Sequence, residues 1–495
     1  MSNILTRRTF LERSAAMALA AASSSFLNVP LFLRRAFAAG SIPAANKKLL
    51  FIFLRGGNDA LNTVIPWADS AYSKKTRPTL YLPPPDPHTS VTGRVPESAD
   101  LKRVVDLGND FAGMHPGLID LAPVFNDGQV AFVHRVGYPK QSRSHFDSQR
   151  YWESGLPANN FAKSGILYRA ITTLGLNRER RFPLISVQPD DPLLLRGPLP
   201  LTTNLSDPNR YGMLGVAKGG TDKDKLWQNI STGFNIPYPA KASRDLLFQM
   251  GTRLSDALDV LKTLGLDRND YFDTDGKTHL FPIDLASDQK GFNLSSFGGA
   301  FSYFQNLKIA AQVLAHTDAI AAGITLDGFD THGNQGALRG PHPDRMRWLG
   351  WTIYGLRKFF TEVDPLLWQN TLVVTLSEFG RTSQENGSGG TDHAEAGAMI
   401  VAGGKIKGGV YQCGNDTWTI GPKGAMFQVT GRYLRRTVDY RSVLGEIIRD
   451  HLGATPAQLE SIIPGYADRR ENLLAGGITL DGTRIAGELD LLEPV

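Results

Sequence analysis

The chain has little cysteine: Cys413 is the only one among 495 residues. One cysteine cannot form a disulfide within the chain, and it cannot supply a metal site built from several thiolates. Beyond the N-terminal region, the sequence also lacks any run approaching the roughly 18 apolar residues that a membrane-spanning helix needs. The fold must therefore hold together without disulfides, and no transmembrane segment is expected after the N-terminal region.

Excess positive charge is also scarce once the N-terminus is set aside. The whole chain has a formal charge of +5 and a pI near 9.1. Residues 1–38 contain five arginines and one glutamate, a net charge of +4, so the remainder is close to +1. The high pI mostly reflects the N-terminal segment, and the composition does not support a nucleic-acid partner.

The N-terminal segment has the pattern of an export signal. A twin-arginine motif, Thr6-Arg7-Arg8-Thr9-Phe10-Leu11, precedes the uncharged, alanine-rich stretch Ser14–Pro30 and the small-x-small site Ala36-Phe37-Ala38. We predict a cleaved signal at 1–38, a periplasmic or secreted protein, and the twin-arginine translocase as a partner during export. The alternative is that the segment is retained as an N-terminal anchor.

Apolar runs bounded by turn residues alternate with helical patterns along the rest of the chain. The predicted strands are Leu49–Leu54, Val130–Val136, Phe182–Val187, Ala319–Leu326, Leu372–Leu376 and Ala398–Ala402. The predicted helices are Ser144–Ser154, Ser243–Leu264, Ser302–His316, Met346–Val363 and Tyr440–Leu452. Such alternation indicates an α/β fold with a mainly parallel sheet covered by helices on both faces. We expect one elaborated domain over 39–495, with inserts at roughly 67–110 and 190–300.

Two predicted strands end in carboxylates, at the edge of a parallel sheet where ligands usually bind. Asp59 follows Leu49–Leu54 within a Gly-Gly-Asn-Asp sequence, and Asp330 and His332 follow Ala319–Leu326. Carboxylate oxygens and an imidazole at strand ends are suitable metal ligands. The alternatives are a turn with a helix N-cap for Asp59 and an ordinary surface histidine for His332.

The strand Val130–Val136 leads into a second group of reactive side chains that includes Ser142, Arg143 and Ser144. A serine at a strand-to-helix turn can act as a nucleophile, and an arginine beside it can bind an anionic group in bidentate fashion. An ordinary serine N-cap with surface charges would give the same pattern.

The strand Leu372–Leu376 is followed by Glu378 and Arg381, and then by Asp392 and His393. A carboxylate beside a buried strand is costly unless it meets a cation, so Glu378 is a candidate metal ligand together with Asp392 and His393. The alternative needs no metal, because Arg381 could form a buried ion pair with Glu378.

These segments together resemble the bacterial DUF1501 proteins, a family of unknown function that is typically exported with twin-arginine signals. The resemblance lies in Leu54-Arg-Gly-Gly-Asn-Asp-Ala-Leu-Asn-Thr63, Ser142-Arg-Ser-His-Phe-Asp147, Phe329-Asp-Thr-His-Gly-Asn-Gln335, Ser377-Glu-Phe-Gly-Arg-Thr382, Asn386-Gly-Ser-Gly-Gly-Thr-Asp-His393 and Val438-Asp-Tyr-Arg-Ser-Val443. The family is grouped with the alkaline phosphatase and sulfatase superfamily. The resemblance therefore implies an alkaline-phosphatase-like three-layer sandwich.

The same resemblance implies a set of site residues. One or two divalent ions (Zn²⁺, Mn²⁺, Ca²⁺ or Mg²⁺) would be held by strand-end ligands, with Ser144, or less readily Ser142, as the nucleophile and Arg143 gripping phosphate or sulfate. The implied ligands are Asp59, Asp330, His332, Glu378 and His393. Ser377-Glu378 lacks the histidine that usually follows in this motif, which puts a second ion in doubt. The sulfatase-like Ser206-Asp-Pro-Asn-Arg210 is misplaced, so formylglycine chemistry is not expected.

Our leading hypothesis is an exported, metal-dependent hydrolase of phosphate or sulfate esters, in which Arg143 or Arg381 steadies the anion. Its substrate would be a small anionic ester or a polysaccharide-type molecule. The competing hypothesis is a non-catalytic exported binding or assembly factor that retains the fold, with or without a structural metal.

Overall fold

A computed structural model of the chain describes residues 47–86, 102–178, 180–205, 264, 270–282, 300–418 and 424–493. The predicted signal at 1–38 and the segment Ser206–Arg210 lie outside these residues. So does almost all of the predicted helix 243–264. These predictions are therefore not tested by the structure.

A nine-stranded sheet forms the centre of the described part, in the order β11-β5-β10-β9-β1-β8-β6-β7, with β12 also paired to β5. All six predicted strands are present in it. Its strands are β1 (Lys48–Leu54), β5 (Val130–Gly137), β6 (Leu184–Ser186), β7 (Thr202–Asn204), β8 (Ala321–Leu326), β9 (Thr371–Leu376), β10 (Gly397–Gly403), β11 (Gly409–Tyr411) and β12 (Val438–Asp439).

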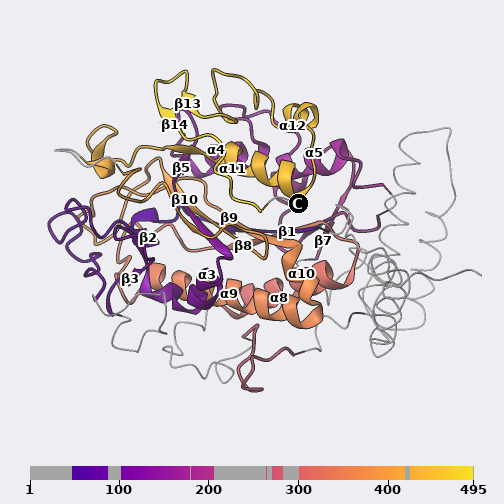
Figure 1. The fold of residues 1–495 in the computed structure, drawn as a ribbon, viewed down its shortest axis with the longest axis horizontal. Coiled ribbons are helices and arrows are strands. Elements are labelled where there is room, and N and C mark those ends of the chain that lie inside the picture. The colour runs from indigo at the N-terminus through magenta and orange to yellow at the C-terminus, as the bar shows by residue number, and fades with distance from the viewer. Residues whose placement is uncertain are drawn as a thin grey trace, which may run out of the picture.

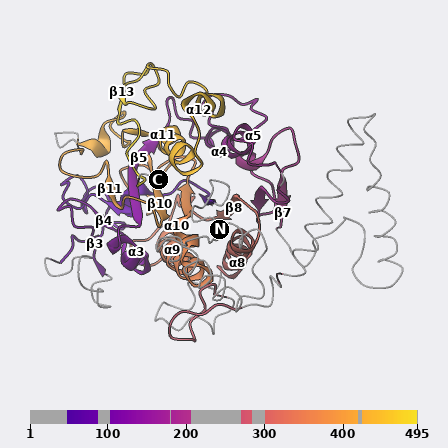
Figure 2. The same cartoon turned by 45° about the vertical axis from the view of Figure 1, so that its right-hand side comes forward.

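Helices cover both faces of this sheet, and Figures 1 and 2 show the three layers from two directions. The lower layer in Figure 1 contains α3 (Ala122–Asn126), α8 (Phe301–His316), α9 (Pro341–Val363) and α10 (Pro365–Gln369). The upper layer contains α4 (His145–Ser154), α5 (Ile166–Thr173), α11 (Tyr440–Glu446) with its π-helical continuation Ile447–His451, and α12 (Pro456–Ile462). The predicted α/β fold class is confirmed, since the sheet is mixed but mostly parallel.

Small elements complete the described part. Two short sheets are formed by β2 (Val64–Ile65), β3 (Val105–Asp106) and β4 (Gly113–Met114), and by β13 (Gly477–Ile478) and β14 (Arg484–Ile485). Short 3₁₀ helices occur at Ala60–Asn62, Pro116–Leu121, Leu193–Leu195 and Ala425–Phe427.

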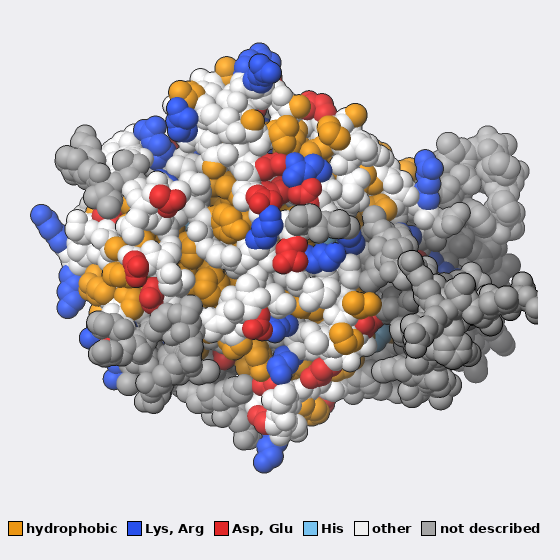
Figure 3. Space-filling view, in the orientation of Figure 1, with side chains coloured by type: hydrophobic (Ala, Val, Ile, Leu, Met, Phe, Trp, Pro, Cys, Tyr) orange, Lys and Arg blue, Asp and Glu red, His pale blue; other side chains and the backbone are white. Residues whose placement is uncertain are grey.

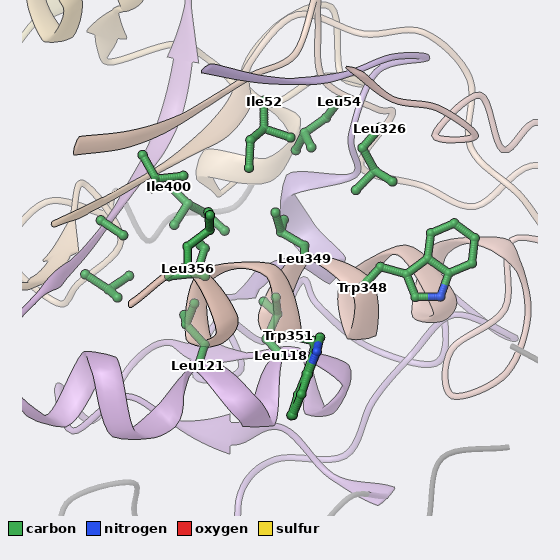
Figure 4. Close-up of a cluster of buried hydrophobic side chains, with 14 of the residues drawn as sticks. Ile52, Leu54, Leu118, Leu121, Leu326, Trp348, Leu349, Trp351, Leu356 and Ile400 are labelled. Atoms are coloured by element: carbon green, nitrogen blue, oxygen red, sulfur yellow. The ribbon is translucent and has the colours of Figure 1, made fainter. Parts of the chain in front are cut away.

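The apolar sequence of β1 explains why the sheet is covered on both sides. Successive side chains of a strand point to opposite faces, and here both sets are buried. Leu50, Ile52 and Leu54 belong to the core with α8 and α9, whereas Leu49, Phe51 and Phe53 belong to the core with α4, α5, α11 and α12. Figure 4 shows Ile52 and Leu54 above α9, where Leu349 and Leu356 complete the lower core.

One strand, β10, runs opposite to its neighbours, and this brings several strand ends to the same edge. β1 is parallel to β8 and β9, while β10 is antiparallel to both β9 and β5. In the register, Leu54 pairs with Leu326, Phe53 with Leu376, and Val136 with Gly397. The connection from β9 to β10, residues 377–396, therefore starts and finishes at the edge where β1, β8 and β5 end.

The surface carries charges of both signs. Figure 3 shows acidic and basic side chains interspersed over the visible face, in keeping with the small net charge expected beyond residue 38. Among the residues that the structure describes, no helix combines the length and apolarity required to cross a membrane.

Candidate metal centre

A group of potential metal ligands lies at the common edge of the sheet. His145 begins α4 after β5, Asp330 follows β8, and His393 lies in the connection between β9 and β10. Their ligand atoms all lie within 4.8 Å of one another. Within the described residues, these three side chains form a group that could hold a metal ion. His332 adjoins the group through contacts with Asp330 and His393.

Three imidazoles in this region are fixed in the same way. Each places Nδ1 against an oxygen that can only accept a hydrogen bond: Glu378 Oε1 at 2.9 Å from His145, Asp392 Oδ1 at 3.0 Å from His332, and the carbonyl of Arg143 at 2.9 Å from His393. Nδ1 must therefore be the protonated nitrogen, which leaves the Nε2 lone pair of each neutral ring free. Metal-binding histidines in proteins are commonly held by such an outer acceptor.

The three Nε2 atoms converge on the carboxylate of Asp330. His332 and His393 lie 3.1 Å from Oδ1, and His145 lies 3.4 Å from Oδ2. The Nε2 atoms of His332 and His393 are only 2.9 Å apart. Two lone pairs at this distance repel unless a proton or a cation lies between them.

These separations suit a divalent ion. Ligands at about 2.0–2.1 Å from a tetrahedral zinc ion are separated from one another by about 3.3 Å. The edges between Asp330 Oδ1, His332 Nε2 and His393 Nε2 are 2.9–3.1 Å, slightly shorter than this, and the distance from Asp330 Oδ2 to His145 Nε2 is 3.4 Å. The donor set therefore fits a metal ion such as Zn²⁺.

The charges in the site also favour a cation. Burial alone would raise the pKa of Asp330, but the hydrogen bond and the positive charge of Arg381 lower it to about 2, so the carboxylate is ionised. Burial lowers the pKa of His393, which favours its neutral, ligand-competent form. The hydrogen bond to Glu378 raises the pKa of His145.

Arg381 is buried at this edge and connects several segments through its hydrogen bonds. It donates 2.6 Å to Asp330 Oδ1, 2.8 Å to the carbonyls of Gly57 and Thr391, and 3.1 Å to that of Phe329. It thus forms an ion pair with Asp330, and the Glu378–Arg381 pair considered from the sequence is not the one that forms. With its donors engaged in this way, Arg381 is poorly placed for the predicted role of gripping a substrate anion.

Asp59, predicted as a metal ligand, lies outside the group of three. Its two carboxylate oxygens accept hydrogen bonds of 2.7 and 3.1 Å from Arg77, and Gln335 donates to it at 2.6 Å. Burial would raise the pKa of Asp59, but Arg77 lowers it, so the pair is ionic. The structure therefore shows Asp59 in a buried ion pair with Arg77, and a metal contact of Asp59 stays a prediction.

Glu378 and Asp392 accept hydrogen bonds from two of the histidines, His145 and His332. Glu378 is completely buried, and its Oε1 accepts from His145, from the backbone N–H of Gly56 at 2.8 Å and from Gln149 at 3.3 Å. Asp392 holds His332 and also accepts from Asn386 at 3.0 Å. Both carboxylates thus contact candidate ligands directly, although neither belongs to the group of three.

The two predicted serines differ in their surroundings. Ser142 Oγ accepts from the backbone N–H of Ser144 and donates to Asp147. Ser144 precedes α4 as its N-cap residue, yet its hydroxyl makes no capping hydrogen bond. Of the two hydroxyls, that of Ser144 is therefore the less committed to the local backbone. Arg143 donates 2.5 Å to the hydroxyl of Tyr433, while its carbonyl holds His393.

The sequence reasoning did not select His145 as a ligand. The signal was present, since His145 follows a predicted strand that ends at the same edge as the strands before Asp330 and Glu378. The neighbouring Ser144 and Arg143 fit the roles of nucleophile and anion-binding group, and they mask the equally reactive imidazole beside them.

Comparison with known proteins gives one family match over part of the chain and no activity. A family model described as "Protein of unknown function (DUF1501)" matches residues 239–438, which are 200 of the 495 residues. This match supports the resemblance seen in the motifs, and its span includes Asp330 and His393 but not His145. No curated protein matches the chain.

Among solved structures, the lipoteichoic acid synthase LtaP from Listeria monocytogenes is similar with a TM-score of 0.28 and 9% identity, over 74% of this chain and 68% of that one. A similarity this low carries no argument about function.

Proposed function

We propose that this protein is a metal-dependent hydrolase of phosphate or sulfate esters. The observation that carries the proposal is the convergence of three Nε2 atoms on the ionised carboxylate of Asp330. His145, Asp330 and His393 would hold the ion, with His332 beside them. A divalent ion bound there would supply a Lewis acid that polarises an ester oxygen and makes a nearby hydroxyl or water more acidic.

The remaining residues would position the reactants. Ser144 adjoins His145 at the start of α4 and offers a hydroxyl that does not cap the helix, so it is the candidate nucleophile. Overall, the ester bond would be cleaved by water, either directly or after transfer of the phosphoryl or sulfuryl group to Ser144. The exposed side of Asp330, whose side chain is 46% accessible, leaves room for a substrate to approach.

A second function is favoured by a specific observation. Arg381 donates its hydrogen bonds to backbone carbonyls and to Asp330, and Arg143 donates a hydrogen bond to Tyr433. Arg381 is not free to grip an anion in this arrangement, whereas Arg143 is exposed and donates to Tyr433 through Nη1. A non-catalytic binding or assembly factor with a structural metal would show the same arrangement. Export through the twin-arginine route remains a prediction in either case.

Metal content and turnover test the proposal together. The purified protein is analysed for metal, stripped with chelator, and reloaded with Zn²⁺ or Mn²⁺ while aryl-phosphate and aryl-sulfate hydrolysis is followed. We expect reversible loss and recovery of turnover. His393→Ala should lose both metal and activity, whereas His279→Ala, a control histidine in the described segment 270–282, should lose neither. Metal binding without turnover on any ester would favour the structural role, and a protein that binds no ion would refute both.

A further inference from the structure

Glu378 is the most deeply buried acidic group at the candidate centre. Its side chain is completely inaccessible, whereas that of Asp392 is 42% exposed. A buried charge is retained only when its surroundings compensate for lost hydration.

The compensation comes from one carboxylate oxygen, Oε1. It accepts from Gly56 N at 2.8 Å, from His145 Nδ1 at 2.9 Å and from Gln149 Nε2 at 3.3 Å. Gly56 has a φ of +116°, and a Cβ there would lie 2.3 Å from the backbone nitrogen of Asp330. The backbone that holds Glu378 is therefore in close contact with the backbone that presents Asp330.

We propose that Glu378 is a positioning residue that acts on the metal through His145, and is not itself a ligand. By accepting from Nδ1, Glu378 selects the tautomer in which Nε2 carries the lone pair and points toward Asp330. It also stiffens the ring and increases its basicity as a ligand. The inference rests on the proposed metal site, and it assigns to Glu378 a different role from the ligand role suggested by its strand-end position.

Asp392 and His332 repeat the arrangement in a more exposed setting. The Asp392–His332 hydrogen bond is 3.0 Å long, close to that between Glu378 and His145, but both partners are more than two-fifths exposed. Water can replace an exposed acceptor more readily than a buried one. Removing the Glu378 carboxylate should therefore weaken metal binding more than removing that of Asp392.

The competing role for Glu378 would use its other oxygen. Oε2 is buried and has no hydrogen-bond partner among the described residues. If Oε2 reached the ion, Glu378 would be a direct ligand, and its loss would change the coordination of the metal. The two roles therefore differ in what a coordination-sensitive spectrum records.

The experiment compares Glu378→Gln, Glu378→Ala and Asp392→Asn with the unmodified protein. Zn²⁺ affinity is measured by competition with a chromophoric chelator, coordination by the visible spectrum of the Co²⁺-loaded protein, and the tautomer by the ¹⁵N shifts of His145 in metal-free protein. Glu471→Gln is the control, because Glu471 is a half-buried carboxylate that bonds Arg441 at 2.9 Å and no histidine in the site.

We expect Glu378→Ala to raise the Zn²⁺ dissociation constant by about 10–100-fold and to leave His145 as a mixture of tautomers. Glu378→Gln retains an accepting oxygen, so it should recover much of the tautomer preference and part of the affinity, with the shape of the Co²⁺ spectrum unchanged. Asp392→Asn should have a smaller effect on affinity, and Glu471→Gln none. If Glu378→Ala does not fold, the isosteric Gln variant carries the test.

Two results would overturn the inference. A changed Co²⁺ spectrum in Glu378→Gln would make Glu378 a direct ligand, and an unchanged tautomer and affinity in both Glu378 variants would leave it without a positioning role. Failure of the proposed function is separately visible. In that case the unmodified protein binds no metal, but the ¹⁵N shifts of metal-free His145 still report whether Glu378 fixes its tautomer.

Discussion

Replacing Asp59 with asparagine tests whether this residue is a metal ligand or the ion-pair partner of Arg77. Asp59 and Arg77 have side-chain exposures of 1% and 0%, and two hydrogen bonds join them. Asn keeps the size but removes the charge, which leaves the guanidinium buried without a counter-ion. Breaking a buried pair in this way costs about 3–5 kcal/mol. With an unfolding entropy of about 2.1 cal/mol/K per residue, a chain of 495 residues loses about 1 °C per kcal/mol, so the melting temperature should fall by about 3–5 °C.

Differential scanning calorimetry and metal analysis measure the two consequences. We expect Asp59→Asn to melt earlier and to bind the same amount of metal per chain as the unmodified protein. Asp344→Asn is the matched control, since its pair with Arg347 is partly exposed and is worth at most about 1 kcal/mol. Adding Arg77→Met to Asp59→Asn should restore part of the stability, because the unpaired charge is then removed. A variant that melts normally but loses its metal would refute this reasoning and return Asp59 to the ligand set.

Three further predictions follow from other parts of the fold. Burial lowers the pKa of Lys48 to about 7, whereas Lys48 in the unfolded chain stays protonated up to about pH 10. The penalty that a buried Lys48 imposes on folding therefore shrinks as the pH rises. Urea unfolding should show the stability of the native protein, relative to Lys48→Met, rising by about 2 kcal/mol between about pH 7 and 9. Gly56→Ala should lower Zn²⁺ affinity in the chelator competition, because the new Cβ would meet the backbone of Asp330 at 2.3 Å; unchanged affinity would contradict this geometry. Leu349→Ala, at a fully buried position of the lower core, should cost about 2–5 kcal/mol in the same urea assay without altering metal content.

Much of the architecture was predictable because local sequence and burial agree. The run Leu49–Leu54 is apolar at every position, as a strand covered on both faces must be, and β1 lies in the middle of the sheet. The strand ends also indicated which segments would meet, since Asp330 and His393 do come together with a third ligand candidate. What the sequence cannot supply is the direction of β10, which depends on tertiary pairing and not on any local pattern.

The detailed roles of the site residues were harder to predict for a physical reason. Asp59 and Asp330 both follow strands that end at the same edge, yet Asp59 meets Arg77, a residue of the insert predicted at 67–110. Arg77 is one arginine among many in the sequence, and nothing in its neighbours indicates that it will be fully buried. The role of Glu378 similarly depends on its partner His145 from α4. A carboxylate can bind a metal ion directly or bind the imidazole that holds the ion, and the sequence does not distinguish these two roles.

The antiparallel direction of β10 has a consequence for the order of assembly. The three candidate ligands come from segments separated by up to 248 positions, His145 to His393, and they meet only when β5, β8, β9 and β10 lie in register. A chain emerging during synthesis cannot form the complete set until β10 has inserted between β5 and β9. Capture of the ion would then mark the insertion of β10, and the rate of metal uptake during refolding would time that step.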